Sequence, residues 1–305
     1  MRRRGLLCAP FLLAAHTSLS HAFVPAHPHL SPFTSSKPSL FQHLRSSGVM
    51  PLSSVTYNSI DAAEDEDVVG KVTADPYIGT KLGTAREQFC AAMSNTAEGQ
   101  AGEALKWIEE ATRTQLTRGY MLTGELPCSV LQSLVMLSKA ERVLEIGAYT
   151  GYSAVAMAAT GAQVTTIDSF EDEPESEAIF HEGVRRSGLQ IRLEKGKALA
   201  VLARLEQEVA KPFDLVFVDA EKRQQIAYYD FLMAHPRLWN PSGAICVDNT
   251  LWYSRVLRSK VEEGDDTTQA VVDFDRYVRN DPKSHVSLLP MRDGLTLIQR
   301  RRPPP

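Results

Sequence analysis

Short apolar runs alternate with longer segments of helical periodicity from Arg142 onward. A run that is apolar at every position fits a strand buried on both faces, and helices between such strands favour parallel pairing. The pattern therefore predicts a mostly parallel sheet with helices on both faces. Strands are expected at 143–146, 163–167, 191–193, 215–218 and 244–247, and helices at 153–159, 175–187, 198–209 and 223–234.

Helical periodicity also covers much of the chain before Arg142. Residues 84–118 predict a helical segment, and a second helix is expected near Pro127, a residue that suits a first helical position. Apolar residues then recur at helical spacing, so this helix should bury one face. They are Val130, Leu131, Leu134 and Val135.

The carboxyl-terminal part changes from strand–helix alternation to a hairpin pattern. Two apolar runs, 285–290 and 295–298, flank a turn signal at 292–294. This arrangement predicts an antiparallel hairpin at the end of the α/β sheet.

Residues 1–60 contain no Asp or Glu and have the features of a targeting leader. Residues 1–4 are basic, 6–15 form a short apolar core, and 20–22 have the small residues of a cleavage site. A Ser-, Pro- and His-rich stretch then begins at Phe23. The leader resembles the signal-plus-transit segments that direct proteins to plastids in algae with complex plastids. Secretion is the alternative, and a segment without a targeting role is the third.

Composition and charge narrow the class of protein further. The chain has 305 residues and a net charge of −4. We expect a linker at 61–83, one domain at 84–302 and a tail at 303–305. The absence of a basic excess argues against a nucleic-acid partner. Four cysteines without a C-x-x-C pair argue against a disulfide framework or a zinc site. No continuous apolar run approaches the ~20 residues of a membrane span.

The stretch Glu145–Ser153, Glu-Ile-Gly-Ala-Tyr-Thr-Gly-Tyr-Ser, joins a predicted strand to a predicted helix. Its glycines, Gly147 and Gly151, suit a backbone that bends sharply or approaches a ligand closely, which predicts a nucleotide-type cofactor. The spacing differs from G-x-G-x-x-G, and Glu145 would repel phosphates but attract a cation. S-adenosylmethionine, which carries an ammonium and a sulfonium group, suits such a turn.

Acidic residues follow the ends of other strands, where ligands bind in parallel α/β sheets. Asp168 comes about 20 positions after the glycine turn, where a carboxylate binds ribose hydroxyls; the alternative is a helix N-cap. Asp219 ends the fourth strand, and Asp248 and Asn249 end the fifth. Two carboxylates and an amide oxygen predict a site for Mg²⁺ or a similar cation, with loop or cap residues as the alternative.

Lys222 follows Asp219 by three residues. Beside a divalent cation its pKa should fall, because like charge and burial both disfavour the ammonium form. It could then act as a general base on a phenol that the same cation acidifies. A solvated surface lysine is the alternative.

Four segments in one order resemble the cation-dependent O-methyltransferase family, which includes caffeoyl-coenzyme A and catechol O-methyltransferases. They are Glu145–Ser153, Asp219–Lys222, Asp248–Trp252 and Asp293–Leu297, and the similarity covers about Met121–Arg300. The resemblance implies a Rossmann-like class I methyltransferase fold with a seven-stranded, mostly parallel sheet whose last strand is antiparallel. It also implies Mg²⁺-dependent transfer from S-adenosylmethionine to one hydroxyl of a small vicinal dihydroxy aromatic of the catechol, caffeoyl or flavonoid type. Homodimers are frequent in the family.

The resemblance also assigns roles by position. The metal ligands are Asp219, Asp248 and Asn249, the catalytic base is Lys222, and the substrate loop begins with Trp252 and Tyr253. The cofactor contacts are Thr123, Glu145, Gly147, Ala148, Ser153, Asp168, Ala198, Asp219 and Glu221.

The chain departs from the family pattern at Glu221, Gln225 and Ser254, where members frequently have Asp, Tyr and Gly. These departures concern substrate preference rather than the metal ligands. Two other functions stay open. A nicotinamide-dependent oxidoreductase is disfavoured by Glu145 and by the lack of a Tyr-x-x-x-Lys arrangement. A non-enzymatic cofactor-binding module would lack the lysine or a metal ligand, and both are present.

Overall fold

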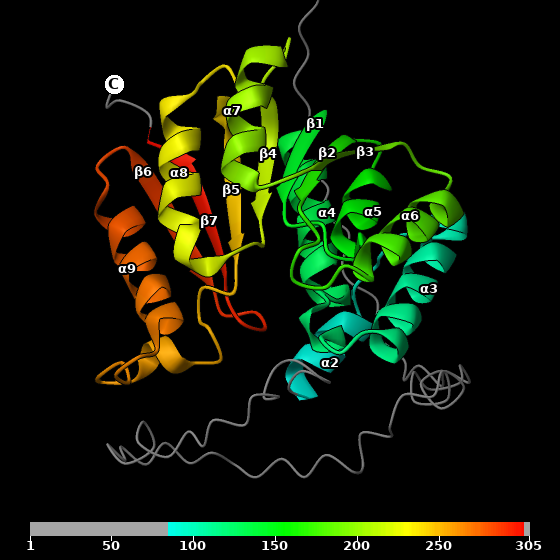
Figure 1. Cartoon of the computed structure of the whole chain (residues 1–305), viewed down its shortest axis with the longest axis horizontal. Helices are drawn as coiled ribbons and strands as arrows, with labels where there is room; N and C mark the ends of the chain where they lie inside the picture. The colour runs from blue at the N-terminus through cyan, green and yellow to red at the C-terminus, as the bar shows by residue number, and fades with distance from the viewer. Residues whose placement is uncertain (1–84, 302–305) are drawn as a thin grey trace, which may run out of the picture. The chain divides into compact units, whose positions relative to one another are not determined.

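The computed structural model describes residues 85–301 (Figure 1). The predicted targeting leader (1–60), the linker (61–83) and the tail (303–305) lie outside the described residues.

Seven strands form one sheet in the order β3-β2-β1-β4-β5-β7-β6. The first five pair in parallel, and β7 runs antiparallel to both of its neighbours, β5 and β6. The predicted mostly parallel sheet with an antiparallel last strand is confirmed. The strands are β1 (Arg142–Ile146), β2 (Gln163–Asp168), β3 (Ile191–Lys195), β4 (Phe213–Val218), β5 (Trp239–Asp248), β6 (Ser284–Leu289) and β7 (Leu295–Arg300).

Helices cover both faces of the sheet, with α3 to α6 on one side and α7 to α9 on the other (Figure 1). The α-helices are α2 (Ala85–Ala92), α3 (Gly99–Gln115), α4 (Glu125–Ser138), α5 (Tyr152–Ala158), α6 (Ser176–Ser187), α7 (Ala198–Glu208), α8 (Gln225–Ala234) and α9 (Asp266–Asn280). Short 3₁₀ turns are η2 (Gly119–Met121), η3 (Lys222–Gln224) and η4 (Arg255–Leu257).

Two helical features differ from the sequence expectation. The predicted helical segment 84–118 is two helices, because α2 ends at Ala92 and α3 begins at Gly99. Just after α2, the hydroxyl of Ser94 donates to the carbonyl of Cys90 at 2.7 Å, and such local side-chain bonds compete with helix continuation. The α9 helix was not predicted from the sequence; Asp265 caps it by accepting from the amide of Thr268 at 3.1 Å.

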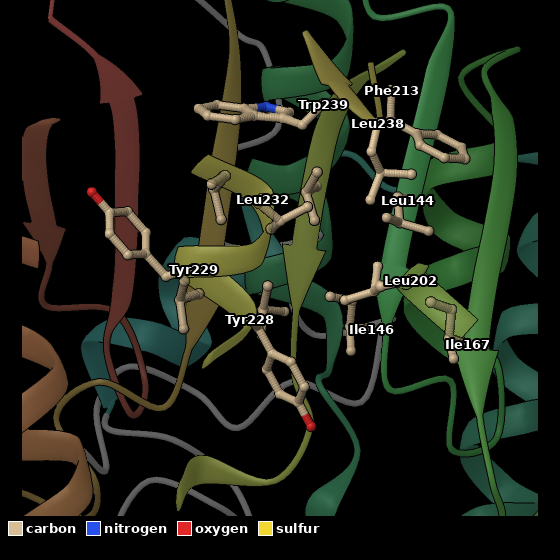
Figure 2. Close-up of a cluster of buried hydrophobic side chains, with 14 of the residues drawn as sticks. Leu144, Ile146, Ile167, Leu202, Phe213, Tyr228, Tyr229, Leu232, Leu238 and Trp239 are labelled. Atoms are coloured by element: carbon tan, nitrogen blue, oxygen red, sulfur yellow. The ribbon is translucent and has the colours of Figure 1, made fainter. Parts of the chain in front are cut away.

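The core on the α7–α9 side fixes how the strands lie beneath the site (Figure 2). Leu144 and Ile146 of β1 point into it, whereas Val143 points to the opposite face and packs with α4 and α5. This alternation along β1 is the period of two that a strand requires. Burial of each large apolar side chain contributes about 1.5–3 kcal/mol. Other members shown in Figure 2 are Ile167, Leu202, Phe213, Tyr228, Tyr229, Leu232, Leu238 and Trp239.

One segment, Gly119–Ser138, is long and apolar enough to cross a membrane by length and composition alone. In the structure it is interrupted, because η2 ends at Met121 and α4 begins at Glu125. The 14 residues of α4 make a helix of about 21 Å, shorter than the ~30 Å hydrocarbon layer. Leu131 and Val135 of α4 are buried in the core, so core packing accounts for its apolar face.

Candidate active site

A cavity of about 810 Å³ lies at the carboxyl ends of β1, β2, β4 and β5. Its volume is within the ~300–1,000 Å³ range of small-molecule sites. Residues that directly follow these strands line it, as expected for a parallel sheet. The predicted site residues in its wall are Thr123, Gly147, Ala148, Ser153, Asp168, Ala198, Asp219, Glu221, Lys222, Asp248, Asn249, Trp252 and Tyr253. Of the predicted site residues, Glu145 alone is not among the lining residues.

Gly147 is placed where no other residue fits. Its φ is +102°, and a Cβ atom there would overlap the backbone carbonyl of Asp219. Two backbone hydrogen bonds hold the segments at Gly147 and Asp219 in place. Gly147 N donates to Ile167 O at 2.9 Å, and Asp219 N donates to Ile146 O at 2.8 Å. This close packing brings the loop after β1 against the loop after β4, so the predicted cofactor turn and the predicted metal ligand share one wall.

Asp168 holds the glycine turn through its carboxylate. One oxygen accepts from the amides of Ala148 and Tyr149 at 2.9 and 2.8 Å, and the other accepts from Phe170 N at 2.7 Å. Three backbone donors therefore fix a carboxylate that faces the cavity. The predicted ribose contact would use the remaining lone pairs of these oxygens.

Glu145 lies beneath the cavity rather than in its wall. The side chain is fully buried, and its two oxygens accept from the hydroxyls of Ser153 and Thr166, each at 2.5 Å. Burial raises the pKa of the carboxyl to about 8, against the lowering effect of these two hydrogen bonds. Glu145 thus links β1, β2 and the first turn of α5. Its position near the end of a predicted strand indicated its place in the fold, but not that neighbouring hydroxyls would occupy its oxygens.

The three predicted metal ligands meet in the cavity wall. Asp248 is buried, and burial together with the nearby carboxylate of Asp219 raises its pKa to about 7. Asn249 has a φ of +61°, and its backbone amide donates to Asp248 at 2.8 Å. A divalent cation would neutralise two like charges held close together, and carboxylate and amide oxygens are its preferred ligands. These residues therefore fit Mg²⁺ or a similar cation. Within residues 85–301, no cluster of three or more His, Cys, Asp or Glu side chains forms another candidate metal site.

Lys222 is buried at the start of η3, and its ammonium nitrogen lies 2.8 Å from an oxygen of Asp219. The pair joins the predicted base to a predicted metal ligand. A buried lysine in a cavity wall is not the solvated surface residue of the alternative interpretation.

Glu221 also reaches the cavity but is engaged with Arg223. The two side chains form an ion pair at 3.0 Å, and the hydrogen bond from Arg223 is the main cause that lowers the pKa of Glu221. The ion pair holds the carboxylate of Glu221 toward Arg223. A cofactor that contacts Glu221 would therefore have to share this carboxylate with Arg223.

The loop after β5 has an unusual backbone. Trp252, Tyr253 and Ser254 have φ values of +43°, +53° and +57°, a region costly for residues other than glycine. The amide of Tyr253 donates to Asp293 at 2.5 Å, and the rings of Trp252 and Tyr253 meet edge to face with centroids 5.1 Å apart. The predicted substrate loop is therefore held in a strained, fixed form by the turn between β6 and β7.

No role was predicted for several charged residues of the cavity wall, among them Glu173, Arg292 and Asp293. Asp293 belongs to a segment that resembled the family, but no role was assigned to it. Glu173 accepts from Tyr149 and from the 117–118 segment, and no periodicity or spacing marks a residue in that loop.

Comparisons with known proteins show which family the chain matches. Residues 93–301 match a family model described as O-methyltransferase. Catechol O-methyltransferase domain-containing protein 1 of Mus musculus is 30% identical over 199 residues, which cover 64% of this chain and 73% of the mouse protein. Caffeoyl-CoA O-methyltransferase of Populus kitakamiensis is 29% identical over 213 residues, which cover 65% of this chain and 86% of the Populus protein. The crystal structure of the SAH-bound methyltransferase PaMTH1 of Podospora anserina aligns with a TM-score of 0.59 and 25% identity, covering 70% of this chain and 93% of that one.

Proposed function

Since this chain belongs to the O-methyltransferase family, we propose that it methylates one hydroxyl of a vicinal dihydroxy aromatic in a reaction that requires a divalent cation. The chain is an S-adenosylmethionine-dependent O-methyltransferase by this membership. The same membership decides against the nicotinamide oxidoreductase and the non-enzymatic module. The proposal concerns the identity of the metal, of the general base and of the methyl acceptor.

The observation that carries the metal assignment is a pair of neighbouring carboxylates in the cavity wall. Burial and the charge of Asp219 both raise the pKa of Asp248, and Asn249 lines the same cavity. These three residues would hold Mg²⁺. A divalent cation at that place supplies Lewis-acid chemistry, which favours the anionic form of an aromatic hydroxyl.

The remaining steps belong to this chain's own side chains. Lys222 would receive the proton of the acceptor hydroxyl, and its Nζ, 2.8 Å from an oxygen of Asp219, supports this role. Trp252 and Tyr253 would orient the aromatic ring from the loop after β5. The glycine turn and Asp168 would hold the adenosine end of S-adenosylmethionine, whose sulfonium provides the methyl group. Binding the methyl donor and the acceptor in one cavity would increase the reaction rate, because it orients the two reacting groups toward each other.

The acceptor class is supported by two relatives named for catechol and caffeoyl-CoA substrates. Localisation in a plastid stays a prediction from the leader, which lies outside the described residues.

The test measures transfer of labelled methyl from S-adenosylmethionine to a panel of catechols and caffeoyl esters, with Mg²⁺ and with excess chelator. We expect transfer to a vicinal diol that falls at least 100-fold in chelator and returns when Mg²⁺ is restored. Equal transfer in chelator would overturn the metal assignment. Transfer to monohydroxy aromatics as fast as to diols would overturn the acceptor class.

A further inference from the structure

Arg292 occupies the turn between β6 and β7, in the cavity wall between two functional loops. Its Nη1 donates to the carbonyl oxygens of Leu122 (at 3.2 Å) and Thr123. Its neighbour Asp293 accepts from the amide of Tyr253. The turn therefore contacts the predicted cofactor loop on one side and the predicted substrate loop on the other.

The backbone and one end of the Arg292 side chain are fixed. Its φ is +47°, and its amide donates to a carboxylate oxygen of Glu87 at 2.6 Å. Nη1 packs directly over Gly124, where any Cβ atom would overlap it. The guanidinium thus has a defined position and does not sweep through the cavity.

The other edge of the guanidinium is available to a ligand. Among residues 85–301, no hydrogen bond or ion pair within 4.0 Å involves Nε or Nη2 of Arg292, whereas Nη1 has two carbonyl partners. Neither atom belongs to the fully buried polar atoms without a partner, so this edge has accessible surface on a residue that lines the cavity. The Nε–Nη2 edge is one that pairs with a carboxylate through two parallel hydrogen bonds.

The turn that carries Arg292 lies on the acceptor side of the cavity. Asp248 pairs with Leu295 between β5 and β7, and the amide of Leu251 donates to the carbonyl of Asp293 at 2.7 Å. Arg292 therefore lies in a turn next to the proposed metal site and the predicted substrate loop. Asp293 does not neutralise the free edge, since the two side chains form no ion pair and Asp293 bonds to Tyr253 instead.

We propose that Arg292 binds a carboxylate on the acceptor, so that the preferred substrates are dihydroxy aromatic acids. The proposal rests on the proposed function and names the acceptor class of the same site. The planar free edge matches the planar carboxylate, and its place beside Asp248 and Tyr253 suits a group attached near the ring. A phosphate of a larger acyl carrier offers similar chemistry, and the experiment separates the two.

The experiment compares kcat/KM for 3,4-dihydroxybenzoate, for its methyl ester and for caffeoyl-coenzyme A in the wild type and variants. The ratio of acid to ester should fall about 10- to 100-fold in Arg292→Gln, as the loss of a charge-assisted pair predicts. The acid-to-ester ratio of Arg292→Lys should lie between those of the wild type and Arg292→Gln, because an ammonium keeps the charge but cannot make the bidentate pair. The matched control is Arg223→Gln, which removes a cavity arginine already paired with Glu221 and should leave the ratio unchanged.

Other outcomes would overturn the proposal. One is an acid-to-ester ratio that is the same in Arg292→Gln, Arg292→Lys and the wild type. Another is a selective loss of caffeoyl-coenzyme A turnover with an unchanged acid-to-ester ratio, which would assign Arg292 to a phosphate. If Arg292→Gln does not fold, the Arg292→Lys ratio decides. Loss of chelator sensitivity with the neutral ester would count against the proposed function and not against Arg292.

Discussion

The phenol of Tyr149 donates a hydrogen bond of 2.7 Å to one carboxylate oxygen of Glu173. The other oxygen of Glu173 accepts from the amide and the hydroxyl of Thr117 and from the amide of Arg118, at 2.9, 2.7 and 3.2 Å. Although burial raises the pKa of Glu173, these hydrogen bonds lower it overall. One buried carboxylate therefore connects the glycine turn, the loop after β2 and the segment after α3.

Replacement of Glu173 by Gln should weaken binding of S-adenosylmethionine. Two backbone amides and two hydroxyls donate to this carboxylate. An uncharged amide would accept weaker hydrogen bonds, because bonds to an ionised acceptor are about twice as strong as neutral ones. We expect the cofactor KM to rise about tenfold with a smaller change in kcat.

Steady-state kinetics with the cofactor varied would check this. Tyr149→Phe should give part of the same effect, and the double variant should show non-additive losses because the two groups share one bond. The matched control is Glu171→Gln, which alters an exposed glutamate in the same cavity wall. Equal KM values for the two glutamate variants would count against a role for Glu173.

Much of the sheet could be predicted because its strands are buried on both faces. Val143 and Leu144 point to opposite cores, which makes the run apolar at every position and easy to recognise. The α9 helix was harder, since its buried positions Val271, Phe274 and Val278 stand among charged residues. Its partners come from α8 and β6, so its burial depends on contacts that the local sequence does not contain.

The candidate site was predictable where chemistry follows a strand end, as at Asp168, Asp219 and Asp248. It was not predictable where the role depends on which atoms meet. Glu145 has the expected place in sequence, yet Ser153 and Thr166 occupy its oxygens. Arg292 reaches the cavity because the last hairpin turns toward the loop at Leu122, a contact between residues 170 positions apart in the chain.

Gly147→Ala should be far more damaging than Gly161→Ala. Both glycines have positive φ, +102° and +94°, but a Cβ at Gly147 would overlap the carbonyl of Asp219, whereas nothing lies within 4 Å at Gly161. The Gly161 variant should therefore lose about 1 kcal/mol from backbone strain. The Gly147 variant should lose more than ~3 kcal/mol, since two backbone segments must move. Urea denaturation would measure both, and similar losses would show that the β1 and β4 loops can separate freely.

Asp248→Asn should remove activity while the fold is retained. The change eliminates one of two neighbouring like charges and one proposed metal ligand, with almost no change in side-chain volume. The wild type should gain thermal stability when Mg²⁺ is added with S-adenosylmethionine, by about 2.7 kcal/mol at a ligand concentration 100 times Kd. The variant should gain nothing from Mg²⁺. Asp172→Asn, at an exposed carboxylate of the same cavity, should behave as the wild type; a normal Mg²⁺ response in Asp248→Asn would exclude Asp248 as a ligand.

Lys222→Met should keep cofactor binding and lose turnover. Methionine fills the volume of the lysine stem but cannot receive a proton, so kcat should fall about 10²- to 10⁴-fold. Isothermal titration of S-adenosylmethionine and single-turnover methyl transfer would separate the two properties. Lys197→Met removes an exposed lysine of the same wall, paired with Glu171 at 3.4 Å, and should turn over normally. Retained turnover in the Lys222 variant would remove its role as the base.

Asp275 of α9 should make the stability of the protein depend on pH. One of its carboxylate oxygens is buried and has no hydrogen-bond partner among residues 85–301. Burial alone raises its pKa from 3.8 to about 7. Because the folded pKa lies above the unfolded one, the contribution of Asp275 to stability is complete below about pH 4 and is lost as the pH rises through 7.

Asp275→Asn should therefore stabilise the protein at pH 8 but not at pH 4. A shift of this size corresponds to about 4 kcal/mol at 1.36 kcal/mol per pH unit, and the side chain is only partly buried, so solvent screening should reduce the gain to about 1–2 kcal/mol. Urea unfolding of both proteins at the two pH values measures it. Asp273→Asn removes an exposed charge from the same helix and controls for the change in net charge. A gain of equal size at pH 4 and pH 8 would mean that the effect arises from packing, because protonation of Asp275 at pH 4 already removes its charge.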